Sequence, residues 1–423
     1  MISQKEYLKR RDTFAKSLKP NSIAVLVSAT MKQRSNDTEY PYRQDSNFYY
    51  LSGFKEDNSI LLIVKEKKKY KTYLFVQKKD KLLELWTGKR VGAKKAQKSF
   101  DFSDVFTIDK FEKELVSFIK EKQNLYFDFS IDDKRVKDIK SKCQNINRHI
   151  DIKYQLGMQR LIKSKAEIKL TKKAIAITKE AHHKAMKIAK ELEYEYELQA
   201  ELEYVFKKNG AYNDAYTSIV ACGNSANTLH YISNDKKLKS KNLILIDAGC
   251  EYNYYSSDIT RSIPVDGKFT DAQKELYQMV LDVEKSIIKM IKPGILRTSL
   301  QEKSEELLCK GLLSLGILKG EFKTLLKEKA HKKYYPHGIG HWMGLDVHDM
   351  SPYKDLASKE FPLAEGMVMT IEPGVYIDKN DKKAPQKYRG IGIRIEDDIL
   401  VTKDGYDNLS KEIIKEISEI ESL

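Results

Sequence analysis

The sequence predicts two domains, an α/β domain at the amino terminus followed by an α+β domain. Two observations predict this division. Up to about residue 155, apolar runs of strand length alternate with helix-like stretches, which is the pattern of an α/β domain. Beyond that point, long helical stretches and strand-like runs favour helix pairs beside an antiparallel sheet. We expect the two domains to span 1–158 and 159–423.

The first domain should open with a helix. Ser3-x-x-Glu6 is a capping-box pattern, and apolar residues follow it at helical spacing until Pro20-Asn21. Two more helices are expected near 111–122 and 132–142. Short apolar runs predict the strands at 23–27, 60–64, 73–76 and 125–129.

The second domain carries three more capping patterns. They are Ser164-x-x-Glu167, Thr270-x-x-Gln273 and Thr298-x-x-Gln301, and each predicts a helix start. A further helix should run from about Glu195 to Asn209, because Gly210 suits the position after a helix end. The predicted strands are 219–222, 242–247, 367–372 and 391–400.

Composition excludes several classes of protein. Of the 423 residues, 41% are hydrophobic, which is enough to fill sizeable cores and argues against a disordered chain. Apolar runs such as Ile60–Val64 fall far short of the ~18 residues that a membrane-spanning helix needs. The four cysteines form no CxxC pair, which argues against a disulfide scaffold or a zinc ribbon. No secretory leader is visible, so we expect a cytoplasmic protein.

The net charge of +15 raises the question of a nucleic-acid partner. It comes from 76 Lys and Arg against 61 Asp and Glu. The lysines are mostly interleaved with acids, and no stretch combines basic and aromatic residues as RNA-binding motifs do. We therefore expect neither nucleic acid nor membrane as a partner.

Two aspartates of the second domain do not look like surface residues. Asp247 follows four aliphatic residues, and Asp258 lies eleven positions later. If a hairpin turned at Tyr252-Asn253, the two would face each other with Cβ atoms about 5 Å apart. Like charges at that distance repel, so either cations lie between them or Arg261 and a lysine pair with them. The spacing leaves both interpretations open.

Two glutamates and a histidine cluster have the same character. Glu372 follows an apolar run. In a strand, Glu396 would share one face with Arg394. Two interpretations are open: Arg394 is the ion partner of Glu396, or Arg394 lies beside a metal that Glu396 binds. Three histidines fall within twelve residues of a Gly-rich stretch, and a fourth precedes Tyr231: they are His337, His341, His348 and His230. Oxygen-rich ligation with one imidazole suits Mn²⁺, Co²⁺, Fe²⁺ or Zn²⁺, whose chemistry at such a site is hydrolysis.

Several motifs together resemble a known family. DAG(x)₈DITR, HGIGHWMGLDVHD, TIEPGVY and GIRIEDD resemble the metallopeptidases of the pita-bread (creatinase-like) fold. The stretch 40–54, YPYRQDSNFYYLSGF, resembles the amino-terminal domain of the aminopeptidase P family, the Xaa-Pro aminopeptidases. The segments 216–220 and 229–231 resemble the same family. The resemblance covers nearly the whole chain, and five ordered motifs make it specific.

The resemblance implies two divalent metal ions, with Mn²⁺ preferred. Asp247 would bind one ion with both oxygens, and Asp258 and Glu396 would bridge the two. His341 and Glu372 would complete the shell of the second ion. The ions would share a hydroxide that attacks the N-terminal Xaa-Pro peptide bond.

The resemblance also implies which residues handle the peptide. His230 and His348 would bind the substrate carbonyl and stabilise the tetrahedral intermediate. His337 would line the subsite of the proline at the second position, and Arg394 would orient Glu396 and the proline side.

Four further residues complete the implied site. Tyr216 and Tyr376 would shape the pocket. Asp37 and Trp86 would reach the site of a neighbouring subunit, which implies a homodimer or a homotetramer.

Three alternatives remain. Prolidase, the Xaa-Pro dipeptidase, shares the ligands, and only the amino-terminal motifs favour aminopeptidase P over it. Methionine aminopeptidase lacks such an amino-terminal domain. A pita-bread domain used only for binding typically loses ligands, whereas all five are present in this sequence.

Overall fold

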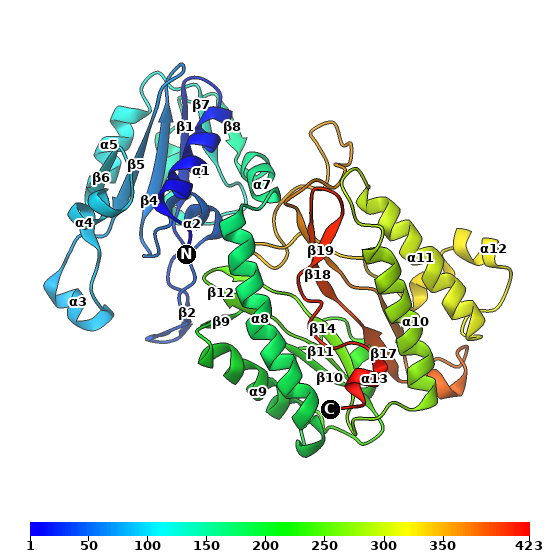
Figure 1. Ribbon diagram of the computed structural model, residues 1–423. Coiled ribbons are helices and arrows are strands. Elements are labelled where there is room, and N and C mark those ends of the chain that lie inside the picture. Colours follow the sequence, from blue (N-terminus) through cyan, green and yellow to red (C-terminus); the bar gives the residue numbers. More distant parts are fainter. The chain divides into compact units, whose positions relative to one another are not determined.

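The computed structural model describes residues 1–423, and the chain forms two compact units, Met1–Arg160 and Leu161–Leu423. Each unit has hydrophobic core residues of its own. None of the helices is both long and apolar enough to cross a lipid bilayer. Figure 1 shows both units, with the chain coloured from its amino terminus to its carboxyl terminus.

A mixed six-stranded sheet forms the centre of the amino-terminal unit, in the order β6-β5-β4-β1-β7-β8. The central strand β1 pairs antiparallel with β4 and parallel with β7. The strands are β1 Ser22–Val27, β4 Ile60–Lys65, β5 Tyr70–Val76, β6 Asp104–Thr107, β7 Asn124–Phe127 and β8 Arg148–Asp151. All six residues of β1 are buried, so both faces of the sheet are covered.

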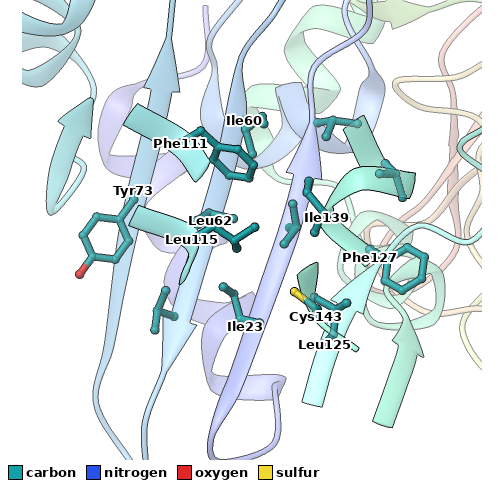
Figure 2. Packing of buried hydrophobic residues seen from close by; sticks show 14 of the residues in the cluster. Ile23, Ile60, Leu62, Tyr73, Phe111, Leu115, Leu125, Phe127, Ile139 and Cys143 are labelled. Atoms are coloured by element: carbon teal, nitrogen blue, oxygen red, sulfur yellow. The ribbon is translucent and has the colours of Figure 1, made fainter. Parts of the chain in front are cut away.

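Helices α5 (Phe111–Phe118) and α6 (Lys134–Lys142) cover one face of this sheet. Figure 2 shows Phe111 and Leu115 of α5 packed over Ile60 and Leu62. The other elements of the unit are α1 Gln4–Ser17, β2 Gln33–Ser35, β3 Thr38–Glu39, α2 Ser46–Ser52, α3 Lys81–Thr87, α4 Gly92–Ser99 and α7 Lys153–Leu161. Ser3 caps α1 as predicted, because its side chain accepts a hydrogen bond from the Glu6 amide.

The second unit is built from antiparallel strand pairs and two pairs of long helices. Helices α8 (Lys165–Ile188) and α9 (Glu195–Lys208) pack together, as do α10 (Asp271–Ile288) and α11 (Arg297–Ser314), and both pairs lie against the strands (Figure 1). This α+β architecture confirms the predicted fold class. The short helices α12 Phe322–Lys327 and α13 Ile417–Ile420 follow later in the chain.

The strands of this unit form several small sheets. Strand β11 lies between β10 and β14, β12 between β13 and β9, and β18 between β15 and β19, while β16 pairs with β17. Their bounds are β9 Asn213–Asp214, β10 Ile219–Cys222, β11 Leu243–Asp247, β12 Cys250–Tyr252, β13 Tyr255–Ser256, β14 Thr260–Pro264, β15 Val368–Ile371, β16 Gly374–Ile377, β17 Ile391–Arg394, β18 Asp397–Val401 and β19 Tyr406–Asn408.

Two of the three predicted capping boxes are present in this unit. Ser164 with Glu167 and Thr270 with Gln273 form both reciprocal hydrogen bonds. The third prediction, at Thr298, is wrong, because α11 starts at Arg297 without a side-chain cap. Thr298 instead bonds to the carboxylate of Glu360 through its amide and its hydroxyl, at 3.0 and 2.6 Å.

The predicted hairpin turn at Tyr252-Asn253 is also wrong. Tyr252 pairs with Tyr255, so the turn is Asn253-Tyr254, and both residues have positive φ angles, 50° and 73°. That is the backbone conformation that a tight two-residue hairpin requires. The shifted register places Asp247 opposite Thr260 and not opposite Asp258.

The strand predicted at 391–400 is two strands in different sheets. Strand β17 pairs with β16, and β18 pairs with β15. Glu396 lies at this break, and Glu372 lies at the matching break between β15 and β16. Residues on both sides of each break are buried, so the alternation of buried and exposed positions that periodicity detects is missing there.

Candidate metal centre

One pocket of about 550 Å³ gathers the unusual acids and histidines of the second unit. Its lining combines charged side chains with an apolar wall of Ile219, Leu229, Ile232 and Val347. The polar lining residues include Tyr216, His230, Asp247, Asp258, His337, His341, His348, Glu372, Arg394 and Glu396.

Three overlapping groups of side chains in this pocket have ligand atoms within 4.8 Å of one another. Asp247, Asp258 and Glu396 form one group, and His341, Glu372 and Glu396 form the second. The third joins Asp258 and His341 to His348. All five predicted metal ligands therefore lie together, although they come from four separate parts of the sequence.

Strand ends and strand breaks place the carboxylates. Asp247 is the last residue of β11, and Asp258 lies in the short segment between β13 and β14. That segment passes close to Gly249, where a Cβ atom would lie 1.9 Å from the Ser257 carbonyl oxygen. Only glycine permits this approach, so Gly249 belongs to the construction of the site.

A second glycine contact positions His341. A Cβ atom on Gly340 would lie 1.9 Å from the carbonyl oxygen of Thr370, on the strand that leads to Glu372. The His341 ring donates from Nδ1 to the Trp342 carbonyl at 3.1 Å, so in the neutral ring Nε2 carries the lone pair that a metal ion would use. Nε2 lies 3.2 Å from Asp258 and 3.8 Å from Glu372, as expected for an imidazole that shares a metal with these carboxylates.

A hydrogen-bonded chain joins two lining residues of the pocket, Arg394 and His337, through Tyr376, which is buried and does not itself line the pocket. Arg394 forms an ion pair with Asp247, and its second guanidinium nitrogen donates to the Tyr376 hydroxyl at 2.9 Å. That hydroxyl in turn donates to Nε2 of His337 at 2.8 Å, while Nδ1 of His337 donates to the Gly338 carbonyl. Burial and the nearby Arg394 charge lower the pKa of His337 to about 3, so this imidazole is neutral.

The pKa shifts in the cluster show that its carboxylates cannot all be ionised without additional positive charge beside them. Burial raises the pKa of Glu372 to about 7, against the attraction of His341 and Arg394. Burial and the neighbouring carboxylates raise the pKa of Glu396 well above its usual range, and burial also raises that of Asp247. Burial lowers the pKa of His341, but the carboxylates of Asp258 and Glu372 raise it to about 9.

These observations fit divalent cations. Protons would have to neutralise the cluster in their absence, whereas cations compensate the charges directly. Asp247 Oδ1 is buried and has no hydrogen-bond partner, so it is an available ligand atom. The alternative that Asp247 and Asp258 pair with Arg261 is wrong, because Arg261 forms its ion pair with Asp397 at 2.7 Å.

Both parts of the chain match known protein families. Residues 169–403 match the model of metallopeptidase family M24, and residues 7–126 match the aminopeptidase P N-terminal domain. The chain belongs to metallopeptidase family M24. This membership implies divalent metal ions, and it confirms the family resemblance of the sequence motifs.

The relatives of this M24 metallopeptidase match it along its full length. Xaa-Pro aminopeptidase of Haemophilus influenzae is 39% identical, with 100% of this chain and 97% of the relative covered. Xaa-Pro aminopeptidase of Escherichia coli is 37% identical, with 100% and 98% covered. Zinc-substituted E. coli aminopeptidase P in complex with product is 34% identical, with a TM-score of 0.94 and 100% and 98% covered. Proline aminopeptidase P II from Yersinia pestis also has a TM-score of 0.94, at 35% identity and with 100% and 99% covered.

The two remaining histidines line the same pocket, whereas the predicted inter-subunit residues belong to the other unit. His230 and His348 are exposed at the rim of the pocket, and the rings of His341 and His348 lie 3.9 Å apart. Asp37 and Trp86 belong to the amino-terminal unit, where Asp37 is exposed in the β2–β3 turn and Trp86 is 80% exposed.

Thr260 also belongs to the site, although no sequence pattern predicted it. Its hydroxyl donates to Glu396 Oε2 at 2.7 Å and accepts a hydrogen bond from Arg394 at 3.1 Å. Arg394 therefore reaches Glu396 through Thr260, while its own ion partner is Asp247. The position of Thr260 inside the DITR motif, next to the implied ligand Asp258, was the available signal.

Proposed function

We propose that this M24 metallopeptidase is a dimetal aminopeptidase that hydrolyses the N-terminal Xaa-Pro bond of peptides, in which residues 1–158 form the amino-terminal domain and 159–423 the catalytic domain. The observation that carries the proposal is the convergence of five metal-ligand side chains in one pocket. The chain also matches relatives named Xaa-Pro aminopeptidase over its full length.

The five side chains would divide between two ions, with Mn²⁺ the preferred metal. Asp247 would hold one ion, Asp258 and Glu396 would bridge both, and His341 and Glu372 would hold the other. When bound, such ions activate a water molecule and polarise the scissile carbonyl. Two of the three groups support this division, since Asp247 lies with Asp258 and Glu396, and His341 and Glu372 lie together with Glu396.

The wall of His337 and Arg394, which the buried Tyr376 joins by hydrogen bonds, would receive the proline side of the substrate. A neutral His337 presents ring carbon atoms to a proline ring without a desolvation cost for charge. Arg394 fixes the Tyr376 hydroxyl, which fixes the His337 ring, so the wall is rigid before substrate arrives. Tyr216 would close the other side of the pocket.

His230 and His348 would act on the carbonyl of the scissile bond. Both line the pocket and are exposed, so their imidazoles can reach a bound peptide. An Xaa-Pro bond has no amide hydrogen, so the enzyme must recognise it through the carbonyl and the ring. A histidine that donates a hydrogen bond to the carbonyl oxygen stabilises the charge that develops there.

We also propose that the protein is a cytoplasmic homodimer or homotetramer in which Asp37 and Trp86 reach the site of a neighbouring subunit. The exposure of both side chains supports this assignment, because neither has an internal packing role. Sedimentation and activity should be measured at the same micromolar concentration. Fully active monomers would contradict the assignment.

The proposed activity is tested by a side-by-side assay with added Mn²⁺. One substrate is an Xaa-Pro dipeptide, and the other is a longer peptide that begins with Xaa-Pro. We expect release of the first residue from the longer peptide. Cleavage of the dipeptide alone would indicate a dipeptidase, and cleavage of neither by metal-loaded protein would contradict the proposal.

A further inference from the structure

The loop that carries His230 is held by a buried carboxylate. The loop follows the short helix Gly223–Asn227 and leads to the β-bridge at Lys237. His230 and Ile232 of this loop line the pocket, and the His230 imidazole makes no hydrogen bond within the chain. Its position must therefore come from its neighbours in the loop.

Both neighbours of His230 are half-buried. Leu229 and Tyr231 pack against a buried cluster that includes Ile219 and Tyr376. The Tyr231 hydroxyl lies 2.8 Å from Glu195 Oε2 and 3.1 Å from Asp235 Oδ1. A phenol has one hydrogen to donate, and the shorter contact assigns it to Glu195.

The environment of the Glu195 carboxylate is unusual for a charged side chain. Glu195 is the first residue of α9, its exposed fraction is 0%, and no cationic side chain pairs with it. Three donors satisfy it instead: Oε1 accepts from the Cys222 amide at 2.7 Å, and Oε2 accepts from the Lys236 amide at 2.9 Å and from Tyr231. A buried charge without a counter-ion is costly, and these donors and the positive end of the helix compensate it.

The three donors stand before the loop, within it and at its end. Cys222 ends strand β10, Tyr231 follows His230 directly, and Lys236 comes where the chain leaves the pocket. Only the Tyr231 contact is made by a side chain next to His230. The far end of the loop has an independent anchor, because Asn234 bonds to the Ser218 carbonyl at 2.8 Å and to the Val220 amide at 2.9 Å.

We propose that Tyr231 and Glu195 are positioning residues that hold His230 at the rim of the pocket in the place where it acts on substrate. The inference rests on the proposed function, in which His230 contacts the scissile carbonyl. Loss of the Tyr231 hydroxyl leaves the loop anchored at Asn234 and at both backbone amides. The loop therefore stays folded, while the imidazole loses the constraint next to it.

The test is a double-mutant cycle between Tyr231→Phe and His230→Ala with a longer Xaa-Pro peptide. In the wild-type background we expect Tyr231→Phe to lower kcat by roughly tenfold and to change KM by less than about twofold. The reason is that a small misplacement of a catalytic group greatly lowers the rate of the chemical step. In the His230→Ala background the same substitution should leave kcat unchanged. A purely structural tyrosine would lower activity equally in both backgrounds, and that result would overturn the proposal.

Two further variants complete the experiment. Tyr70→Phe is the matched control, since Tyr70 also donates to a carboxylate, Asp12 Oδ1 at 2.7 Å, but lies in the amino-terminal unit. It should leave kcat and KM at wild-type values. Glu195→Gln should reproduce the kcat loss of Tyr231→Phe and its dependence on His230, and a Glu195→Gln variant with full kcat would contradict the role of the carboxylate.

Bound metal and thermal stability should be measured for every variant. Tyr231→Phe should retain wild-type metal content, which separates a misplaced histidine from a damaged metal centre. A wild-type enzyme that fails to cleave Xaa-Pro peptides would refute the proposed function itself. A wild-type enzyme that cleaves them, together with an uncoupled cycle, would refute only the inference about Tyr231 and Glu195.

Discussion

The floor and the rim of the pocket are built in different ways. The floor consists of the carboxylates Asp247, Asp258, Glu372 and Glu396, which lie at the ends or breaks of paired strands. The rim carries His230 and His348, which are exposed, and His230 lies on an irregular loop. Backbone pairing in strands fixes a side chain from both sides, whereas loop residues depend on a few side-chain anchors. The difference suggests that the floor sets metal binding and that the rim sets what happens to the peptide.

The largest effect should come from the floor. We expect Asp258→Asn to keep its fold but to lower activity by roughly a thousandfold or more, the scale seen when a group on which the whole reaction depends is removed. The amide is a much poorer bridging ligand than the carboxylate. Peptide hydrolysis at saturating Mn²⁺ measures the effect.

Asp266→Asn is the matched control for that substitution. Asp266 lies in the same unit but is exposed and bonds only to Ser240 and Lys241. It should retain full activity. Substantial hydrolysis by Asp258→Asn at saturating Mn²⁺ would show that Asp258 does not bridge the ions.

A rim substitution should separate activity from metal content. His230→Ala should lower kcat by about a hundredfold, the usual contribution of a group that stabilises developing charge. Its metal content should stay at the wild-type level, because none of the three groups of metal-ligand atoms includes His230. Metal analysis and kcat should be measured on one preparation, with His149→Ala, an exposed histidine of the amino-terminal unit, as control. A His230→Ala variant that loses metal would show that His230 is a metal ligand.

A substitution at Thr260 tests whether a hydrogen bond to the floor carboxylate Glu396 supports metal binding. Thr260→Val keeps the shape of the side chain but removes the hydroxyl that donates to Glu396. We expect metal affinity to fall by roughly 10- to 100-fold, the range for hydrogen-bond partners of metal ligands. A Mn²⁺ titration of activity measures it, and an unchanged midpoint would show that Glu396 needs no such support.

The smallest effect concerns the stability of the metal-free floor. The folded-state pKa of Glu372 is raised from 4.5 to about 7, and that of His341 from 6.5 to about 9. For both groups the folded state holds its proton more tightly than the unfolded state does, so stability falls as pH rises between about 4.5 and about 9. Chelator-treated protein should therefore have a higher Tm at pH 5.5 than at pH 8.5.

Metal should remove that dependence, because the ligands bind it in their deprotonated forms. The same melting curves with saturating Mn²⁺ should show little fall in Tm toward pH 8.5. A metal-free protein that becomes more stable as pH rises would contradict the charge crowding inferred for the floor.

The parts of this protein that the sequence predicted well are those with a strong local signal. The strands at Ile60 and Ile219 and the capping boxes at Ser164 and Thr270 follow from patterns of a few residues, and the structure confirms them. The motifs also placed the five metal ligands in one domain, although their roles as ligands remain predictions.

The features that the sequence did not reveal depend on distant partners. The hairpin register differs because a turn at Asn253-Tyr254 and one at Tyr252-Asn253 are nearly equivalent in local sequence, and the pairing of β11 with β14 decides between them. Thr298 does not cap α11 because Glu360, 62 positions later, takes its hydroxyl. The contact between Tyr231 and Glu195 likewise joins residues 36 positions apart.

The most direct test of the difference between floor and rim is to measure bound metal and Xaa-Pro peptide hydrolysis together for the wild type, Asp258→Asn and His230→Ala. We predict that the wild type binds two ions per chain and releases the first residue of the peptide. Asp258→Asn should lose both metal and activity. His230→Ala should keep the metal while its kcat falls by about a hundredfold. Equal metal loss in the two variants, or an active Asp258→Asn enzyme, would contradict the account.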